Sequence, residues 1–231
     1  MKLDTKFVHL GRETAREVHA VNPPLVRAST VVSSTLDEYK GIYKTKVFNT
    51  PRYGRSGTST TFEFQRTMAA LAGTESCIAT SCGLSAIVAV LGTYAGPGRH
   101  FLVSDAVYGP TRAFCDNELT ALGTVTEYFS NTDDVAKLIR PETALIFVET
   151  PASLTMEMYD LRAICGAAKE KNVPVAADTT WGTPVFLDGH SLGANLCIHA
   201  ATKYLNGHSD LMLGAITGTE EDMELVRHYC D

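Results

Sequence analysis

The chain has 231 residues, of which 45% are hydrophobic and 20% are charged, enough for one domain with a sizeable core and some additional segments. Its formal net charge of -6 and the lack of a basic stripe argue against nucleic acid or anionic membranes as partners. Residues 1–10 show no apolar stretch of signal-peptide length, and no apolar run approaches the ~20 residues that span a bilayer, so we expect a cytoplasmic protein.

The cysteines favour the same compartment. No two of them form a CxxC pair, and most lie inside apolar segments, as small core residues of reduced proteins do. We therefore expect neither a disulfide framework nor a metal site. The residues concerned are Cys77, Cys82, Cys115, Cys165, Cys197 and Cys230.

The N-terminal quarter differs in character from the rest of the chain. Residues 1–58 are rich in Thr, Ser, Asn and Pro and show no sustained hydrophobic period, which predicts an extended arm. From Thr60 the apolar spacing suits a helix, and Gly73 stands just beyond its end. We therefore expect a compact domain over residues 59–231.

Within this domain, short apolar runs alternate with helix-like stretches. The expected strands cover 76–80, 100–104, 124–129, 144–149, 173–177, 196–200 and 213–217, and the expected helices cover 84–94, 111–122, 133–139 and 161–171. Strands alternating with helices predict an α/β fold, a three-layer sandwich in which a mainly parallel sheet is covered on both faces. Ligands of such sheets bind outside the carboxyl ends of the strands.

Two residues near those strand ends suggest a specific chemistry. Asp178 ends an apolar run, and Lys203 follows the next one in the segment His199–Asp210. A lysine can form a Schiff base with the aldehyde of pyridoxal phosphate, and a carboxylate can keep the ring nitrogen of that cofactor protonated. We expect Lys203 to be carried inward, where burial would lower its pKa. A surface lysine and a loop-capping aspartate are the structural alternatives.

Other residues fit the same ligand, although each has an ordinary structural explanation. Gly83 opens a helix directly after a strand, where free amides can bind phosphate, or where glycine simply relieves crowding. Tyr108 precedes Gly-Pro at the end of another strand and could stack on a flat ring, or form a surface turn. Arg55 offers a planar fork for phosphate, with the Tyr53 hydroxyl beside it, and such residues of an arm can serve a neighbouring subunit.

The order of these motifs resembles the Cys/Met-metabolism enzymes of pyridoxal phosphate fold type I, and most of all their bacterial cystathionine β-lyase branch. The resemblance covers essentially the whole chain. It rests on Lys2–Thr5, Tyr53-Gly-Arg55, Cys82-Gly83, Glu149-Thr-Pro151 with Thr155-Met-Glu157, Asp178-Thr-Thr-Trp181, and Ala201–Leu205 running into Gly207–Asp210. It implies the large domain of an aspartate-aminotransferase-like fold, preceded by an arm that contacts the neighbouring subunit.

The resemblance also implies a role for each site residue. Lys203 would hold the cofactor covalently and act as base, Asp178 would pair with the ring nitrogen, with Thr180 nearby, and Tyr108 would stack on the ring. Gly83, Leu84 and Thr202 would bind the phosphate, joined by Tyr53 and Arg55 from the partner subunit in a dimer of dimers. The implied catalytic residues are Lys203, Tyr108 and Tyr53.

The implied reaction is β-elimination from a sulfur amino acid, with cystathionine giving homocysteine, pyruvate and ammonia in methionine biosynthesis. Ala200 departs from a serine common in the family, and Ser153 replaces an asparagine of the γ-acting branches, which favours β-elimination. Family members continue into a C-terminal domain that supplies an arginine for the substrate carboxylate, so we expect this chain, which ends at Asp231, to be shortened. The alternatives are an inactive cofactor-binding or subunit-associating fragment, and a γ-lyase or γ-synthase on the same scaffold.

Overall fold

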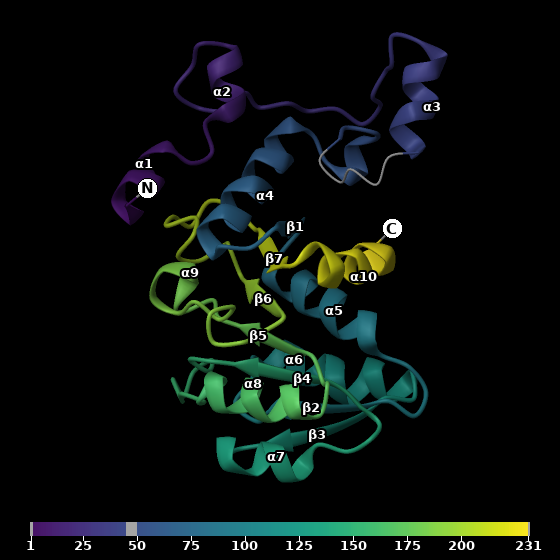
Figure 1. The fold of residues 1–231 in the computed structure, drawn as a ribbon, viewed down its shortest axis with the longest axis vertical. Helices are drawn as coiled ribbons and strands as arrows, with labels where there is room; N and C mark the ends of the chain where they lie inside the picture. The colour runs from purple at the N-terminus through teal and green to yellow at the C-terminus, as the bar shows by residue number, and fades with distance from the viewer. Residues whose placement is uncertain (1, 45–49, 231) are drawn as a thin grey trace. The chain divides into compact units, whose positions relative to one another are not determined.

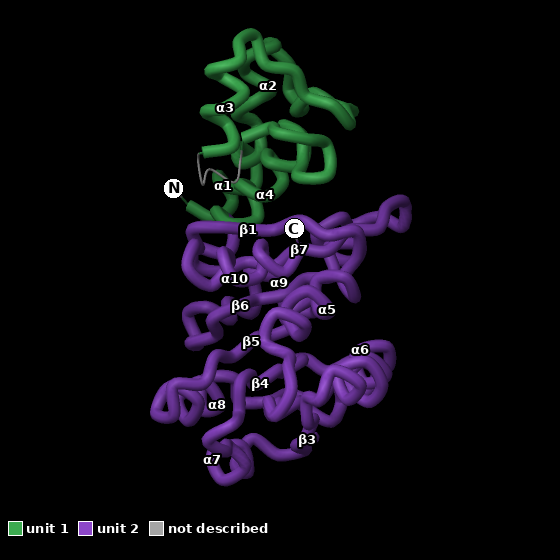
Figure 2. Tube along the Cα trace, turned by 90° about the vertical axis from the view of Figure 1, so that its right-hand side faces the viewer, with its two compact units in different colours: residues 1–70 green, residues 71–231 purple. Residues whose placement is uncertain are grey.

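A computed structural model describes residues 2–44 and 50–230. The chain divides into two compact units, residues 1–70 and residues 71–231, which Figure 2 draws in different colours. The larger unit contains a seven-stranded sheet, and the smaller unit contains the N-terminal segments together with most of the helix that begins at Ser59. Within the described ranges, no helix is both long enough and apolar enough to cross a membrane.

The sheet is mainly parallel, as the alternation of strands and helices predicts (Figure 1). Its order is β1-β7-β6-β5-β4-β2-β3, and β7 alone runs against the other six strands. The strands are β1 (Ser76–Thr80), β2 (His100–Ser104), β3 (Val125–Phe129), β4 (Thr143–Glu149), β5 (Val175–Asp178), β6 (Leu196–His199) and β7 (Gly214–Gly218). Six carboxyl ends therefore meet at one edge of the sheet.

The sheet has a hydrophobic core on each face, because successive side chains of a strand point to opposite sides. In β4, Leu145 and Phe147 belong to the core that includes residues of α5 (Gly83–Tyr94), β2 and α10 (Glu220–Cys230). Ile146 and Val148 belong to the opposite core, with α7 (Val135–Leu138) and α8 (Leu161–Glu170). Figure 2 accordingly shows α7 and α8 on one side of the sheet and α5 on the other, which is the predicted three-layer arrangement.

The expected helix over 111–122 is the element that differs most in this unit. The chain forms α6 (Gly109–Phe114) and then a π-helical turn, η2 (Cys115–Leu119), in which the Thr120 hydroxyl donates to the Cys115 carbonyl at 3.3 Å. Cys115 and Leu119 are both fully buried. A π turn inserts one residue into the helical repeat, and hydrophobic spacing alone does not reveal such an insertion. Two further short helices are η3 (Thr132–Asp134) and α9 (Thr183–Phe186).

The arm is not simply extended, and the prediction missed three short helices in it. These are α1 (Leu3–His9), α2 (Glu13–Glu17) and α3 (Leu36–Lys44), followed by the 3₁₀ turn η1 (Gly54–Ser56) and α4 (Ser59–Ala72). Glu63 of α4 accepts hydrogen bonds from the amides of Glu13 at 3.0 Å and Thr14 at 3.4 Å. A distant carboxylate therefore stabilises the N-terminus of α2, and local sequence cannot show this.

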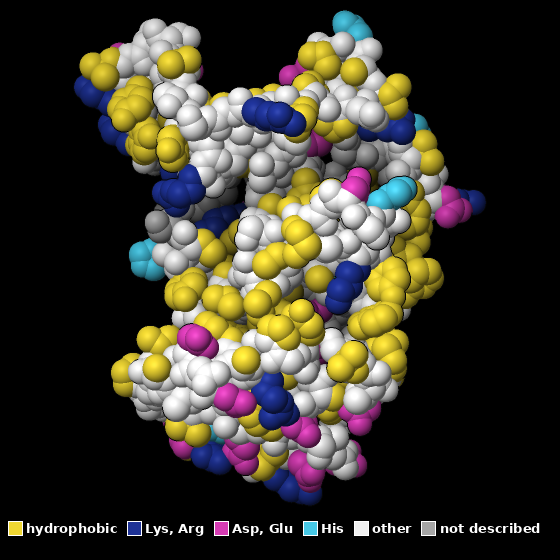
Figure 3. All heavy atoms as spheres, turned by 180° about the vertical axis from the view of Figure 1, so that it is seen from behind, with side chains coloured by type: hydrophobic (Ala, Val, Ile, Leu, Met, Phe, Trp, Pro, Cys, Tyr) yellow, Lys and Arg dark blue, Asp and Glu magenta, His cyan; other side chains and the backbone are white. Residues whose placement is uncertain are grey.

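Figure 3 shows how charged side chains are distributed over one face of the molecule. Toward the lower end of Figure 3, Lys and Arg side chains lie among Asp and Glu side chains and form no continuous basic patch on the face drawn. Arg140 pairs with Glu127 and Arg112 with Asp105, so carboxylates neutralise these two cations.

We predict that truncating a buried side chain at the centre of the sheet lowers the stability of the fold. Leu145 is fully buried, so Leu145→Ala should lower the free energy of unfolding by about 2–5 kcal/mol through lost burial and a residual cavity. Leu122→Ala is the matched control, because this leucine is 51% exposed and its change should stay within about 0.5 kcal/mol. Urea unfolding followed by circular dichroism measures both, and equal effects would contradict the assignment of Leu145 to the core.

Candidate cofactor site

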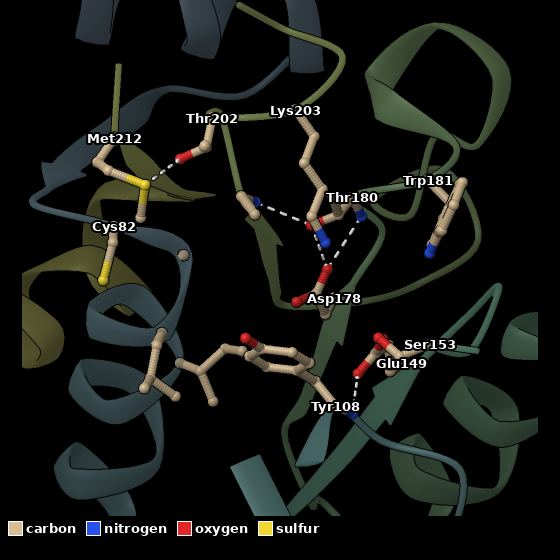
Figure 4. Close-up of a pocket in the computed structure, with 14 residues that line it drawn as sticks. Cys82, Tyr108, Glu149, Ser153, Asp178, Thr180, Trp181, Thr202, Lys203 and Met212 are labelled. Carbon is tan, nitrogen blue, oxygen red and sulfur yellow. Dashed lines mark hydrogen bonds between the residues drawn. The ribbon is translucent and has the colours of Figure 1, made fainter. Parts of the chain in front are cut away.

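A pocket lies where the carboxyl ends of the strands converge (Figure 4). It is lined by residues that follow β1, β2, β4, β5 and β6, so segments far apart in the sequence meet there. The chemically important lining residues are Gly83, Leu84, Tyr108, Glu149, Asp178 and Lys203. All belong to the larger unit, and the pocket lies at the edge of the sheet where the sequence predicts a site.

Asp178 is the most constrained of these residues. It is the last residue of β5 and only 6% exposed. Its Oδ1 accepts hydrogen bonds from the Thr180 amide at 2.9 Å and from the Thr180 hydroxyl at 2.6 Å. The Ala200 amide donates to that hydroxyl at 2.8 Å, which ties the end of β5 to the segment after β6. Asp178 therefore does cap the loop after β5. Among the described residues, this capping uses only one of its two carboxylate oxygens.

The electrostatics of Asp178 favour a cationic ligand. Burial, followed by the negative charge of Glu149, raises the pKa of Asp178 from 3.8 to about 6, although the Thr180 hydrogen bonds and the positive charge of Lys203 oppose the shift. A buried carboxylate is most stable beside a cation that it can hydrogen-bond. A protonated pyridine nitrogen is such a cation, so the residue fits the ring of pyridoxal phosphate.

Lys203 lines the pocket, but the structure corrects the expectation that it is buried. β6 ends at His199, and the chain then turns, with the Lys203 amide donating to the Ala200 carbonyl at 3.0 Å. The residue is exposed and reaches the pocket from its rim. Its Nζ lies 5.9 Å from the centre of the Tyr108 ring. The amine and the aromatic face therefore border the same space.

Tyr108 lies on the wall of the pocket opposite Lys203 in Figure 4. It follows β2, immediately before Gly109 and Pro110 begin α6, and it is 43% exposed. Its backbone amide donates to Glu149 Oε2 at 2.6 Å. A fixed backbone and an open ring are what a stacking position requires, since the ring can then lie against a flat ligand.

The start of α5 offers the second part of the site. A Cβ at Gly83 would stand 2.6 Å from Ala200 Cβ, so the crowding explanation for this glycine is correct. The first turn of a helix also carries amides without intrahelical partners, and α5 has twelve residues to orient them. Leu84 lines the pocket beside Gly83. The turn thus fits a phosphate group as well, and phosphate binding here stays a prediction.

Thr202 is less free than the resemblance implies. Its hydroxyl donates to the Leu213 carbonyl at 3.1 Å and accepts from the Leu213 amide at 2.9 Å. Donation to a phosphate would require this hydroxyl to give up the Leu213 carbonyl. The Met212 sulfur lies 3.9 Å from the same oxygen and lines the pocket. Met212 was not predicted as a site residue, because it lies in the apolar run Leu211–Leu213 leading into an expected strand and resembles an ordinary core residue.

Two predicted residues belong to the other unit. Tyr53 and Arg55 lie at η1, where the Gly54 amide donates to the Ser29 carbonyl at 2.7 Å, and both are exposed. A Cβ at Gly54 would come within 2.0 Å of the Ala28 carbonyl oxygen, so only glycine permits this approach of the two segments. The role of Tyr53 and Arg55 at the cofactor stays a prediction.

Glu149 belongs to the motif Glu149-Thr-Pro151, for which the sequence predicted no role. It ends β4 in direct register with Asp178 of β5 and is 4% exposed. The signal that identified Asp178, an acidic residue ending an apolar strand, could also have identified Glu149. Among residues 2–44 and 50–230, no group of three or more His, Cys, Asp or Glu side chains is arranged to hold a metal ion.

Comparison with known proteins identifies relatives along nearly the whole chain. A putative cystathionine beta-lyase from Saccharomyces cerevisiae is 35% identical over 99% of this chain, which spans 66% of that relative. Cystathionine beta-lyase MetC from Escherichia coli is 35% identical over 98% of the chain, which spans 58% of it. An L-alanine/L-glutamate racemase from Wolbachia pipientis wMel is 32% identical, again over 98% of the chain and 58% of the relative. The chain thus spans less than two thirds of the length of these relatives.

The fold and a family model agree with these relatives. The crystal structure of metB from Corynebacterium glutamicum superposes with a TM-score of 0.89 and 26% identity, and covers 99% of this chain and 58% of its own. This likeness confirms the predicted α/β fold. The model of the Cys/Met metabolism PLP-dependent enzymes matches residues 4–229. The chain therefore belongs to the Cys/Met metabolism family of PLP-dependent enzymes.

Proposed function

We propose that this chain carries the cofactor site of a carbon–sulfur β-lyase that uses pyridoxal phosphate in methionine metabolism. Its substrate would be L-cystathionine or a related cysteine S-conjugate, and its products homocysteine or another thiol, pyruvate and ammonia. The observation that carries the proposal is one pocket in which Lys203, the buried Asp178 and the open ring of Tyr108 face the same space. The relatives named cystathionine beta-lyase support the choice of reaction.

Bound pyridoxal phosphate supplies an electron sink for the electrons released when a bond to the α-carbon of an amino acid breaks. Lys203 is proposed to attach the cofactor and, when the substrate amine replaces it, to take the α-proton as a general base. Asp178, held by Thr180, would keep a proton on the ring nitrogen. Tyr108 would cover one face of the ring and limit the access of water to it.

Ser153 supports β-elimination over a γ-acting reaction. Its side chain is short, and its hydroxyl donates to Glu149 at the edge of the pocket. An asparagine at this position would be larger and would add an amide to the pocket. The γ-lyase or γ-synthase reading is therefore the second candidate, and the cofactor residues are the same in both.

We further propose that the working form is a homo-oligomer in which Tyr53 and Arg55 reach the phosphate in a neighbouring subunit's pocket. Support comes from their exposure on a turn whose Gly54 amide donates a hydrogen bond to the Ser29 carbonyl. All six cysteines are free thiols, which suits the reducing cytoplasm as the proposed location.

Cofactor attachment and product identity test the reaction. With pyridoxal phosphate and cystathionine, the wild-type chain should show a visible absorption band and release pyruvate, whereas Lys203→Ala should lose the band and reduce pyruvate release by about 100-fold or more. Lys137→Ala, at a side chain that is 76% exposed, is the matched control and should behave as wild type. Release of α-ketobutyrate would indicate a γ-lyase. A band without turnover would indicate a cofactor-binding fragment, and unchanged activity in Lys203→Ala would refute the proposal.

The raised pKa of Asp178 predicts a pH effect in the cofactor-free protein. A carboxyl whose folded-state pKa lies above its unfolded value stabilises the fold at low pH, and this contribution is lost as pH rises toward the folded value. The free energy of unfolding of the wild type should therefore fall between pH 4 and pH 6, by about 3 kcal/mol relative to Asp178→Asn. Asp133→Asn, at an exposed position, is the control and should follow the wild type. Parallel curves for wild type and Asp178→Asn would refute the prediction.

Subunit complementation tests the shared site. Coexpressed Lys203→Ala and Tyr53→Phe chains should recover activity, because a hybrid dimer places an intact Lys203 beside an intact Tyr53 in one of its two sites. Random pairing should restore about a quarter of the wild-type activity, while each variant alone is inactive or weak. No recovery, with hybrid dimers present by mass spectrometry, would show that Tyr53 serves its own subunit.

A further inference from the structure

Glu149 is a buried charge that the proposed reaction does not use. Each carboxylate oxygen accepts a hydrogen bond from a different loop: Oε2 from the Tyr108 amide at 2.6 Å, and Oε1 from the Ser153 hydroxyl. Its own amide donates to the Ser104 hydroxyl at 3.0 Å, at the end of β2. The residue therefore fastens the loop after β2 to the loop after β4 at the pocket edge.

These hydrogen bonds alone do not explain why position 149 is a glutamate rather than a neutral residue. Both donors are neutral, and among the described residues no Lys, Arg or His side chain forms an ion pair with Glu149. Burying a carboxylate without a cation is costly, and a glutamine could accept from Tyr108 and still bond to Ser153. Glu149 of β4 also stands in register with Asp178 of β5, so two buried carboxylates lie at the same edge of the sheet.

We propose that Glu149 is a positioning residue of the cofactor site. Its carboxylate fixes the backbone of Tyr108 at the pocket wall and supplies, beside Asp178, a second negative charge that helps to retain the proton on the cofactor's ring nitrogen. The inference rests on the proposed roles of Asp178 and Tyr108. The field of Glu149 already acts on Asp178, whose carboxyl it makes harder to ionise.

This arrangement also assigns a role to Ser153. A serine hydroxyl has one proton, and here it is donated to Glu149. It is therefore not available as a donor to the substrate. Ser153 acts through Glu149, by holding the carboxylate in the orientation that binds the Tyr108 amide.

Two substitutions separate the charge from the hydrogen bonds. Glu149→Gln removes the charge and keeps an acceptor for the Tyr108 amide, whereas Glu149→Ala removes both. Glu118→Gln, at an exposed glutamate of η2, is the matched control. Thermal unfolding with circular dichroism establishes that each variant is folded. The readouts are the dissociation constant of pyridoxal phosphate, and the ¹⁵N chemical shift of ring-labelled cofactor followed against pH.

In Glu149→Gln, the ring nitrogen should lose its proton at a lower pH than in the wild type, and the cofactor should bind about 10-fold more weakly. Glu149→Ala should weaken binding further, because Tyr108 is then also released, while Glu118→Gln should match the wild type. If both Glu149 variants keep the wild-type affinity and nitrogen titration, the proposal is wrong. If neither Glu149 variant folds, the dissociation constant of pyridoxal phosphate is measured for Ser153→Ala instead. Weaker cofactor binding in this variant supports the proposal, and wild-type binding overturns it. A wild-type chain that binds no cofactor would instead refute the proposed function.

Discussion

The pocket depends on one electrostatic constraint, the burial of the Asp178 carboxylate at the end of β5. A charge in this position is unfavourable unless donors and a cation surround it, and among the described residues only Thr180 donates to the carboxylate, at one of its two oxygens. Thr180 in turn binds the Ala200 amide, which orients the start of the segment that leads to Lys203. Within the part of the chain that the structure describes, the hydrogen bonds among Asp178, Thr180 and Ala200 thus leave Asp178 without a cationic partner. They also connect it to the segment that carries Lys203.

The direction of the strands explains why these groups meet at all. β1, β2, β4, β5 and β6 run in parallel, so the residues that follow them gather at one edge although they are spread from Gly83 to Lys203. The sheet is covered on both faces, and its central strands are therefore largely apolar between their ends, as in β4, where all seven residues are buried and the polar ones, Thr143 and Glu149, stand at the two ends. The acidic residues of β4 and β5 stand at the carboxyl ends of these strands, where they line the pocket.

The carboxylates of Asp178 and Glu149 show how two similar residues acquire different roles. Both end buried strands and lie in register, but Asp178 has an oxygen toward the pocket, whereas Glu149 uses both oxygens to hold Ser153 and Tyr108. One carboxylate is thereby directed to the ligand and the other to the loops that surround it. The negative charge of the second still reaches the first, because little water lies between buried groups to screen it.

Much of the fold was predictable, since apolar runs of strand length alternate with helical stretches and both signals are local. Strand limits were correct to within two residues, and α4, α5 and α8 occur where expected. The failures have physical causes. The π turn at Cys115–Leu119 is one inserted residue in an otherwise helical pattern, and α2 depends on a carboxylate of Glu63 that lies 50 residues away in sequence. Neither effect leaves a trace in hydrophobic spacing.

The sequence by itself determined the class of fold and the family, because both rest on residue type and order. Only the tertiary structure decided how those residues stand. It placed Lys203 at the exposed rim rather than in the interior, engaged the Thr202 hydroxyl with Leu213, and joined Glu149 to Tyr108. These relations depend on the register of neighbouring strands and on turns that follow them, and both are fixed by packing between segments distant in sequence rather than by the local chain.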